Sequence, residues 1–361
     1  MTTAPSTEIL EHRIFRQGPA SVTVACGVPE ALAHATATLY SYHQQAGGKG
    51  AWHLTVQLTT EMPALPESGT MKVEIGPGIT ARAAIRPGHA AFLVGEPTAC
   101  ITADLTSRRI DARFATSSAA MYFTTRLIRQ VITAQLLEAG ALYAHAAAAT
   151  IRRRGVIIAG NRHRGKTTTL LALLRHLHCD YVTNDRLLIT QEPDGRITGV
   201  PWPARMRAGV GTLLAYPDLA DLIPSCLRAT PCGALWQLRD KVSIDPPDFP
   251  RLIANGTVTG RCVPELMLWP AIHPRNQAVR AEPVDPEEVR DTLTTTRLFM
   301  HDPRNGISSH VNHWLIPPPA PEIEAARLAA LSGALARNVP CFRLHAGADP
   351  AALARAAAEL L

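Results

Sequence analysis

Eight residues between positions 160 and 167 carry the most recognisable chemistry of this chain. They read Gly160-Asn-Arg-His-Arg-Gly165-Lys166-Thr167, and they lie between the apolar runs 155–159 and 169–174. A glycine-rich loop between a strand and a helix turns successive backbone N–H groups toward phosphate oxygens, and the positive end of the helix dipole points at the same place. The pattern G-x-x-x-x-G-K-T in this context predicts a P-loop that binds a nucleotide.

We expect ATP and Mg²⁺ to be the ligands of this loop. Lys166 is expected to neutralise the β- and γ-phosphates, and the Thr167 hydroxyl to bind Mg²⁺. The other residues expected to surround the phosphates are Gly160, Asn161, Arg162, His163, Arg164, Gly165 and Thr168. The middle of the loop is bulkier and more cationic than usual. A glycine-bounded turn between a strand and a helix, without a ligand, is the alternative interpretation.

A P-loop alone does not separate kinases, GTPases and ATPases, so a second acidic element is needed. Asn184 and Asp185 lie between the apolar residues Tyr181-Val182 and Leu187–Ile189, nineteen residues after Lys166. This spacing allows one helix and a turn before the chain returns beside the P-loop strand. Asp185 could then bind Mg²⁺ or accept a proton; a turn at the edge of a strand is the alternative. No N-K-x-D guanine-reading motif occurs, which disfavours a GTPase.

Three features in this order resemble the HPr serine kinase family and its relatives in peptide and natural-product biosynthesis. They are Ala144-His145-Ala146, the P-loop, and Tyr181-Val-Thr-Asn-Asp-Arg186. The family shows His-Ala-Ser, then G-x-S-G-x-G-K-S, then Ala-Asp-Asp-Arg. The resemblance spans roughly residues 120 to 200 and does not include the first 115 residues. Weaker similarity extends to Gly199-Val-Pro201, to Lys241 and to the tail 344–361.

The resemblance implies an ATP- and Mg²⁺-dependent kinase that transfers the γ-phosphoryl group to a hydroxyl of a peptide or protein serine, or of a small biosynthetic intermediate. It places His145 near the γ-phosphate and makes Asp185 the second acid of a pair. The first acid, which the family uses as a base, is Asn184 here, so Asp185 or His145 must accept the proton. We find no counterpart to an HPr-recognition tail. A regulatory or vestigial nucleotide-binding module without transfer is the alternative function.

Candidate acceptor-binding residues follow the Asp185 region. The segment 199–207 is stiffened by prolines and carries arginines, so Trp202 could stack on an acceptor and Arg205 could bind an anionic group; a solvated loop is the alternative. Lys241 stands where the resembling family has a lysine, which implies a phosphate contact. Asn184 completes the expected acceptor set.

We expect an α/β fold in two domains, because 361 residues exceed what one core usually supports. Residues 1–116 predict a small α+β domain with a helix over 30–45 and alternating strands. Residues 117–361 predict the P-loop kinase-like core, which opens with a helix over 117–139 and a single strand over 142–151. The segment 317–361 is its C-terminal extension, with helices over 321–337 and 351–361 and a strand over 341–344. The strands expected before residue 116 are 20–26, 52–58, 71–75, 79–85, 91–94, 99–105 and 109–115.

Composition sets further limits on partners. A hydrophobic content of 46% with 18% charged residues indicates a globular protein, and the net charge of +6 is too diffuse to favour nucleic acid. No apolar stretch is long enough to cross a bilayer, and residues 1–17 do not form a signal peptide. The seven scattered cysteines are typical of reduced thiols, so we expect a cytoplasmic protein without membrane contact. Whether the protein forms a homo-oligomer is left open by the sequence.

Overall fold

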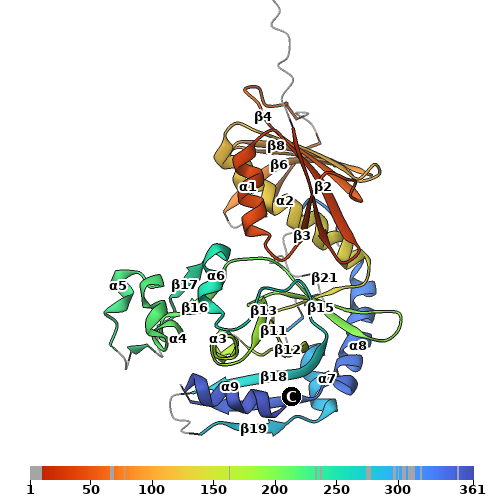
Figure 1. The fold of residues 1–361 in the computed structure, drawn as a ribbon. Coiled ribbons are helices and arrows are strands. Elements are labelled where there is room, and N and C mark those ends of the chain that lie inside the picture. The colour runs from red at the N-terminus through yellow and green to blue at the C-terminus, as the bar shows by residue number, and fades with distance from the viewer. Residues whose placement is uncertain are drawn as a thin grey trace, which may run out of the picture. The chain divides into compact units, whose positions relative to one another are not determined.

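The computed structural model divides into two compact units, and each is described by itself (Figure 1). Unit 1 comprises residues 1–139 and 309–318, and unit 2 comprises residues 140–308 and 319–361. The residues that the structure describes are 10–65, 69–76, 78–161, 163–231, 234–235, 238–273, 278–295, 298–299, 301–302, 306–307, 314–317, 319–347 and 349–361.

Unit 1 is built on one mixed sheet, which has nine strands in the described part of the chain, in the order β3-β1-β2-β4-β9-β8-β7-β6-β5. Two parallel pairings, β2 with β4 and β4 with β9, lie in its middle, and the other pairings are antiparallel. The strands are β1 (Glu11–Gln17), β2 (Ala20–Cys26), β3 (His43–Ala46), β4 (Trp52–Leu58), β5 (Met71–Gly76), β6 (Ile79–Arg86), β7 (His89–Val94), β8 (Ala99–Asp104) and β9 (Arg109–Phe114).

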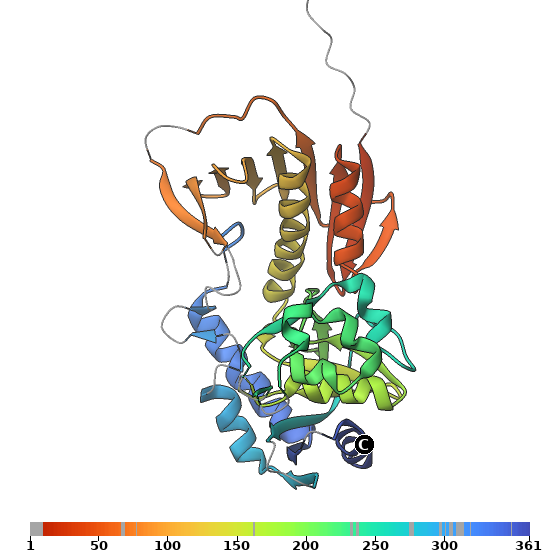
Figure 2. The same ribbon diagram turned by 90° about the vertical axis from the view of Figure 1, so that its left-hand side faces the viewer.

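The helices α1 (Pro29–Thr38) and α2 (Ser117–Glu138) pack side by side against this sheet (Figure 2). The Thr116 hydroxyl caps α2 by accepting a hydrogen bond from the Ala119 amide, and Phe123 of α2 stacks on Phe114 of β9. Because α2 packs against β2, β4 and β9, it belongs to unit 1. We expected the second domain to begin at residue 117; the boundary lies after Ala139 instead.

Unit 2 is also mixed α/β, which agrees with the expected fold class. Its larger sheet has the order β13-β11-β12-β18-β22-β19 and six strands among the described residues; β12, β18 and β22 run parallel. A second sheet has the order β10-β14-β15. The strands are β10 (Leu142–Ala144), β11 (Ala147–Ile151), β12 (Arg154–Ile158), β13 (Cys179–Thr183), β14 (Leu187–Gln191), β15 (Ile197–Pro201), β18 (Pro264–Ile272), β19 (Arg280–Pro283) and β22 (Cys341–Ala346).

Helices cover both faces of the larger sheet (Figures 1 and 2). On one face, α7 (Pro286–Thr295) and α8 (Pro321–Asn338) share a hydrophobic core with the sheet, in which Ile157 and Met267 lie beside Leu293 and Leu335. On the other face lies α3 (Lys166–His176), which contacts β11, β12, β13 and β18 and packs against α9 (Pro350–Glu359). This three-layer arrangement suits parallel strands, which are buried on both faces.

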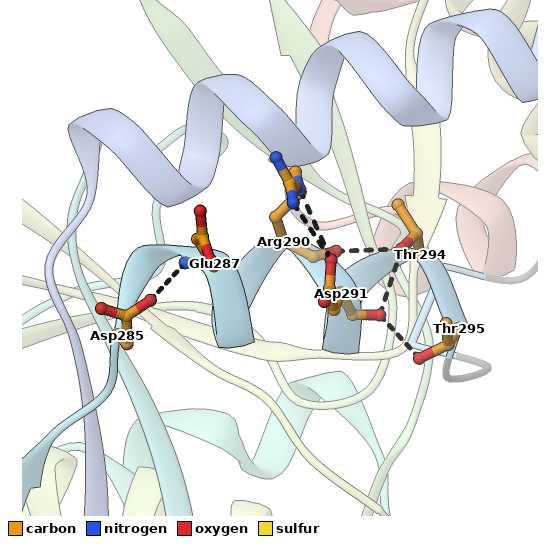
Figure 3. A network of polar contacts seen from close by, with 6 residues as sticks. All are labelled: Asp285, Glu287, Arg290, Asp291, Thr294 and Thr295. Carbon is orange, nitrogen blue, oxygen red and sulfur yellow. Dashed lines mark hydrogen bonds and ion pairs between the residues drawn. The ribbon is translucent and has the colours of Figure 1, made fainter.

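A polar network fixes both ends of α7 (Figure 3). At the start, the Asp285 carboxylate accepts a hydrogen bond from the Glu287 amide at 2.8 Å. In the last turn, the Thr295 hydroxyl donates to the Asp291 carbonyl at 2.6 Å, and Thr294 donates to the same carbonyl at 3.1 Å. The carbonyl of Leu298, a few residues further on, contacts the candidate site described below.

Between β15 and β18 the chain forms a small subdomain beside α3. Its antiparallel ribbon pairs β16 (Met206–Gly209) with β17 (Lys241–Ile244). The short helices around it are α4 (Val210–Leu214), η1 (Pro217–Leu222), α5 (Ser225–Arg228), η3 (Pro246–Asp248) and α6 (Phe249–Leu252), and the last described ribbon of unit 2 pairs β20 (His301–Asp302) with β21 (Gly306–Ile307). No helix in the described part of the chain is both long and apolar enough to span a membrane.

Two of the expected elements are wrong in detail. The helix expected over 30–45 ends at Thr38, and residues 43–46 form β3, which pairs with β1. The strand expected over 142–151 is divided into β10 and β11, which belong to different sheets. The division falls at His145 and Ala146.

Candidate functional site

The topology of unit 2 brings the three sequence motifs to one edge of the larger sheet. β12 and β13 end at this edge, because both are antiparallel to β11, and β11 begins there. The P-loop follows β12, Asn184 and Asp185 follow β13, and His145 precedes β11. These residues are therefore neighbours although up to forty residues separate them in sequence.

His145 and Asp185 face each other across a break that two strand pairs share. β10 pairs with β14 and β11 pairs with β13, both antiparallel, so the chain changes sheets at His145 and again between Asn184 and Arg186. The Leu298 carbonyl accepts a hydrogen bond from the His145 amide at 2.6 Å, and the Arg186 carbonyl accepts one from the Thr183 hydroxyl at 2.9 Å. These bonds fix both crossings.

The loop between β12 and α3 has positive φ angles at three of its described residues. Gly160 and Gly165 have φ angles of +134° and +104°, and His163 has a φ of +63°. A Cβ on Gly165 would come within 2.5 Å of the Ile272 side chain, so glycine is required there. Arg164 is exposed, and its carbonyl accepts a hydrogen bond from the Ile272 amide at 3.2 Å. Arg162 lies outside the described residues.

Lys166 begins α3 and points back into the loop. Its ammonium donates to the carbonyls of Gly160 at 2.8 Å and Asn161 at 3.2 Å, and the residue is only 8% exposed. The Thr167 hydroxyl lies 3.5 Å from the Arg207 carbonyl of β16, which is at the limit of a hydrogen bond. The Thr168 hydroxyl is bonded to the Thr212 hydroxyl at 2.8 Å, so this side chain joins α3 to α4.

The Asp185 carboxylate lies among cationic groups. Its Oδ1 is 3.2 Å from His145 Nδ1, and its Oδ2 is 3.6 Å from Arg186 Nε. Burial alone would raise the pKa of Asp185, but the hydrogen bond and charge of His145 and the charges of Arg186 and Lys166 outweigh it and lower the pKa from 3.8 to about 2. Asp185 is therefore ionised at neutral pH. The charge of Lys166 is one of the causes that lower the pKa of Asp185, so the two residues lie close enough to interact electrostatically.

Arg186 and Trp202 form a support behind this carboxylate. The Arg186 guanidinium lies over the Trp202 ring at 4.4 Å, and the Trp202 amide donates to the Arg186 carbonyl at 3.1 Å. Tyr143 packs edge-on against Trp202 with ring centroids 6.2 Å apart. Trp202 was expected to stack on an acceptor, yet the ring is already stacked on Arg186. The sequence indicated Arg186 only as the last residue of the segment 181–186, which resembles the family's Ala-Asp-Asp-Arg, and gave it no role.

The other residues expected to bind the acceptor differ in their burial and in their contacts. Asn184 is only 6% exposed, and its Oδ1 accepts no hydrogen bond from the described residues. Arg205 forms an ion pair with Asp245 at 2.5 Å, so its charge is already compensated. Lys241 is exposed on β17, where it pairs across the ribbon with Gly209.

A scan against protein-family models and a search of curated proteins each found no match to this chain. The resemblance to the HPr serine kinase family consequently rests on three short segments, Ala144–Ala146, Gly160–Thr167 and Tyr181–Arg186.

Proposed function

We propose that this protein is an ATP- and Mg²⁺-dependent kinase of the P-loop type, related to the HPr serine kinase family, which phosphorylates a hydroxyl. The observation that carries the proposal is the meeting of three groups at one sheet edge: the buried Lys166 of the loop, the ionised Asp185, and His145 bonded to it. Charge neutralisation and positioning are what phosphoryl transfer chiefly requires.

The loop and its neighbours fit a magnesium nucleotide. Residues with positive φ at Gly160, His163 and Gly165 favour a concave row of N–H groups, and the first turn of α3 adds the helix dipole. Mg²⁺ is commonly held by one or two protein oxygens together with phosphates and water, which the Thr167 hydroxyl and the Asp185 carboxylate would supply. The ion would neutralise charge on the phosphates. One or two protein oxygens suffice for such a magnesium site, because the phosphates and water supply the other ligands.

The sequence leaves Asp185 and His145 as alternative proton acceptors, and the low pKa of Asp185 supports His145. General bases work best when their pKa is close to the working pH, and a carboxylate with a pKa of about 2 is a weak base. Asp185 instead accepts the Nδ1–H of His145, and this bond orients the imidazole so that its Nε2 can accept a proton. We assign the base to His145 and its orientation to Asp185.

The proposed transfer forms one bond and breaks one bond at the γ-phosphorus. The acceptor oxygen forms a bond to the γ-phosphorus, the bond from this phosphorus to the bridging oxygen of ADP breaks, and the acceptor proton passes to His145. Lys166 stabilises the charge on the phosphoryl oxygens, as the loop lysine does in P-loop enzymes. A buried amide at position 184 takes no proton.

Mass spectrometry tests the proposal. The protein is incubated with MgATP and a set of serine-containing peptides and small hydroxyl compounds, alongside Lys166→Ala. Phosphate on an acceptor with the wild-type protein, and none with the variant, supports a kinase. Tight nucleotide binding without any transfer supports the nucleotide-binding module instead.

A further inference from the structure

The β16–β17 ribbon presents two cations that have no ion-pair partner among the described residues. Arg207 and Lys241 are both exposed, and neither forms an ion pair within the described part of the chain. Arg207 pairs with Ser243 and Gly209 pairs with Lys241, so the two cations are diagonal neighbours on one face of the ribbon. The opposite face is apolar and buried, with Met206, Ala208, Val242 and Ile244 at 6% exposure or less.

The other charges of this region are arranged differently. Arg205 and Asp245 neutralise each other one step along the same face. Arg239 and Asp240 precede β17, and Asp240 forms no ion pair with either Arg207 or Lys241 among the described residues. The ribbon face therefore keeps two positive charges.

The β16 edge of this ribbon adjoins the proposed phosphate site through the main chain. The segment from Pro201 to Arg207 is bonded at one end to Arg186, through the Trp202 amide, and its other end lies at the Thr167 hydroxyl, through the Arg207 carbonyl. The segment 201–207 therefore runs from the neighbourhood of Arg186 and Asp185 to the first turn of α3. An acceptor that approaches Asp185 and His145 along this segment would meet the ribbon cations.

We propose that Arg207 and Lys241 bind carboxylates of the acceptor, so that the enzyme phosphorylates a hydroxyl with acidic groups close by. The inference rests on the proposed kinase function and specifies its substrate class. Carboxylates suit this site because Arg207 can bind one with two parallel N–H groups while Lys241 provides a second positive charge. An acidic peptide and a small polycarboxylate offer the same chemistry.

Equilibrium binding tests the inference independently of transfer. Two labelled peptides with one central serine, flanked by aspartates in one and by asparagines in the other, are titrated in the presence of Mg²⁺ and a non-hydrolysable ATP analogue. The acidic peptide should bind more tightly. Each of Arg207→Ala and Lys241→Ala should weaken it about twofold to fivefold, and the double variant about tenfold, because exposed ion pairs contribute modestly.

Controls and added salt complete the experiment. Arg228→Ala removes an exposed cation from α5 and should leave binding unchanged. Raising the ionic strength should remove the preference for the acidic peptide, because salt screens exposed charges. Citrate distinguishes the two sources of carboxylate: displacement of the peptide by citrate at low concentration identifies a small polycarboxylate, and indifference to citrate identifies an acidic peptide.

Three results would overturn the inference while leaving the kinase proposal standing. They are equal binding of the two peptides, binding of neither peptide, and a loss of affinity for the ATP analogue in Arg207→Ala and Lys241→Ala that matches the loss for the peptide. The last result would assign the pair to the nucleotide. Failure of the kinase itself appears separately, as absence of phosphoryl transfer to any acceptor.

Discussion

Replacing Asp185 with asparagine separates the structural and the chemical role of this carboxylate. The substitution keeps the size of the side chain and removes its charge, so Oδ1 can still contact His145 Nδ1. The structure predicts a small loss of stability, because both ion pairs of Asp185 are partly exposed, with 47% of its side chain accessible. Each such pair contributes about 0.2–1 kcal/mol, so the free energy of unfolding should fall by about 0.4–2 kcal/mol.

The effect on phosphoryl transfer should be far larger. A positioned proton acceptor typically contributes about a hundredfold to ten-thousandfold in rate, and the asparagine can donate to Nδ1 and so favour the wrong tautomer of His145. We expect kcat of Asp185→Asn to fall by this amount, while the dissociation constant of ATP measured without Mg²⁺ changes about threefold or less, because the contact with His145 acts mainly in the transition state. Steady-state kinetics with the acceptor found by mass spectrometry, and calorimetric titration with ATP in the absence of Mg²⁺, measure the two quantities.

Asp180→Asn is the matched control. Asp180 lies on β13, close in sequence to Asp185, and accepts hydrogen bonds from the Thr257 amide at 2.8 Å and from the Thr257 hydroxyl at 3.1 Å. This variant should lose about 1–3 kcal/mol of stability and keep its kcat. His145→Ala should be as slow as Asp185→Asn, and the double variant no slower than either, because the two residues act as one unit. Wild-type kcat in both single variants, or effects that multiply in the double variant, would refute the assignment.

Three further expectations concern other residues of the site, and a fourth concerns the pH dependence of Asp185. Lys166→Ala should abolish transfer and weaken ATP binding about tenfold to a hundredfold, measured by fluorescent-nucleotide titration, since a charge-assisted contact is worth about 1.5–3 kcal/mol. Thr167→Ala should raise the Mg²⁺ concentration needed for half-maximal rate, with little change at saturating Mg²⁺. Trp202→Ala should lower kcat through loss of the stack on Arg186, and Trp202→Phe should restore most of it; equal rates in both would contradict a positioning role. The pKa of Asp185 is lowered to about 2, so its stabilising effect should be full above its ordinary value of 3.8 and disappear as the pH falls toward 2. The difference in urea unfolding free energy between wild type and Asp185→Asn should thus be smaller at about pH 3 than at about pH 5.

The burial of Asn184 makes an acidic replacement at this position costly. Restoring the acid pair with Asn184→Asp would place a carboxylate at a site that is 6% exposed, next to the ionised Asp185. A buried charge beside a like charge is costly unless a cation lies between them. This variant should be less stable than wild type in thermal unfolding without Mg²⁺, and Mg²⁺ should recover part of the loss.

Local patterns in the sequence were enough to predict much of the fold. Alternating apolar residues predicted β2 and β4 at their observed bounds. The helix predicted from residue 351 begins one residue earlier, at Pro350, where the Asp349 carboxylate accepts hydrogen bonds from the Ala351 and Ala352 amides. Each of these signals is contained in a few neighbouring residues, so it does not depend on tertiary packing.

Features that depend on distant partners could not be predicted in the same way. β3 forms because residues 43–46 pair with residues 13–16 of β1. The polar sequence His-Gln-Gln-Ala has no alternation of apolar residues from which a strand could be predicted. The alanine-rich run 142–151 has no period that shows a break, so the division at His145 was missed. The order of the motifs was enough to identify His145, Lys166 and Asp185 as candidate site residues. The stack of Trp202 on Arg186 and the position of the ribbon beside Thr167 could not be predicted, because they depend on packing between distant segments.

A crystal structure of the protein with Mg²⁺ and a non-hydrolysable ATP analogue tests the central claim most directly. We predict that the loop 160–167 surrounds the phosphates, that Lys166 Nζ lies within hydrogen-bonding distance of the γ-phosphate, and that this phosphate faces His145 and Asp185. An analogue whose phosphates lie outside the loop, or a loop that stays empty at saturating analogue, would contradict the account.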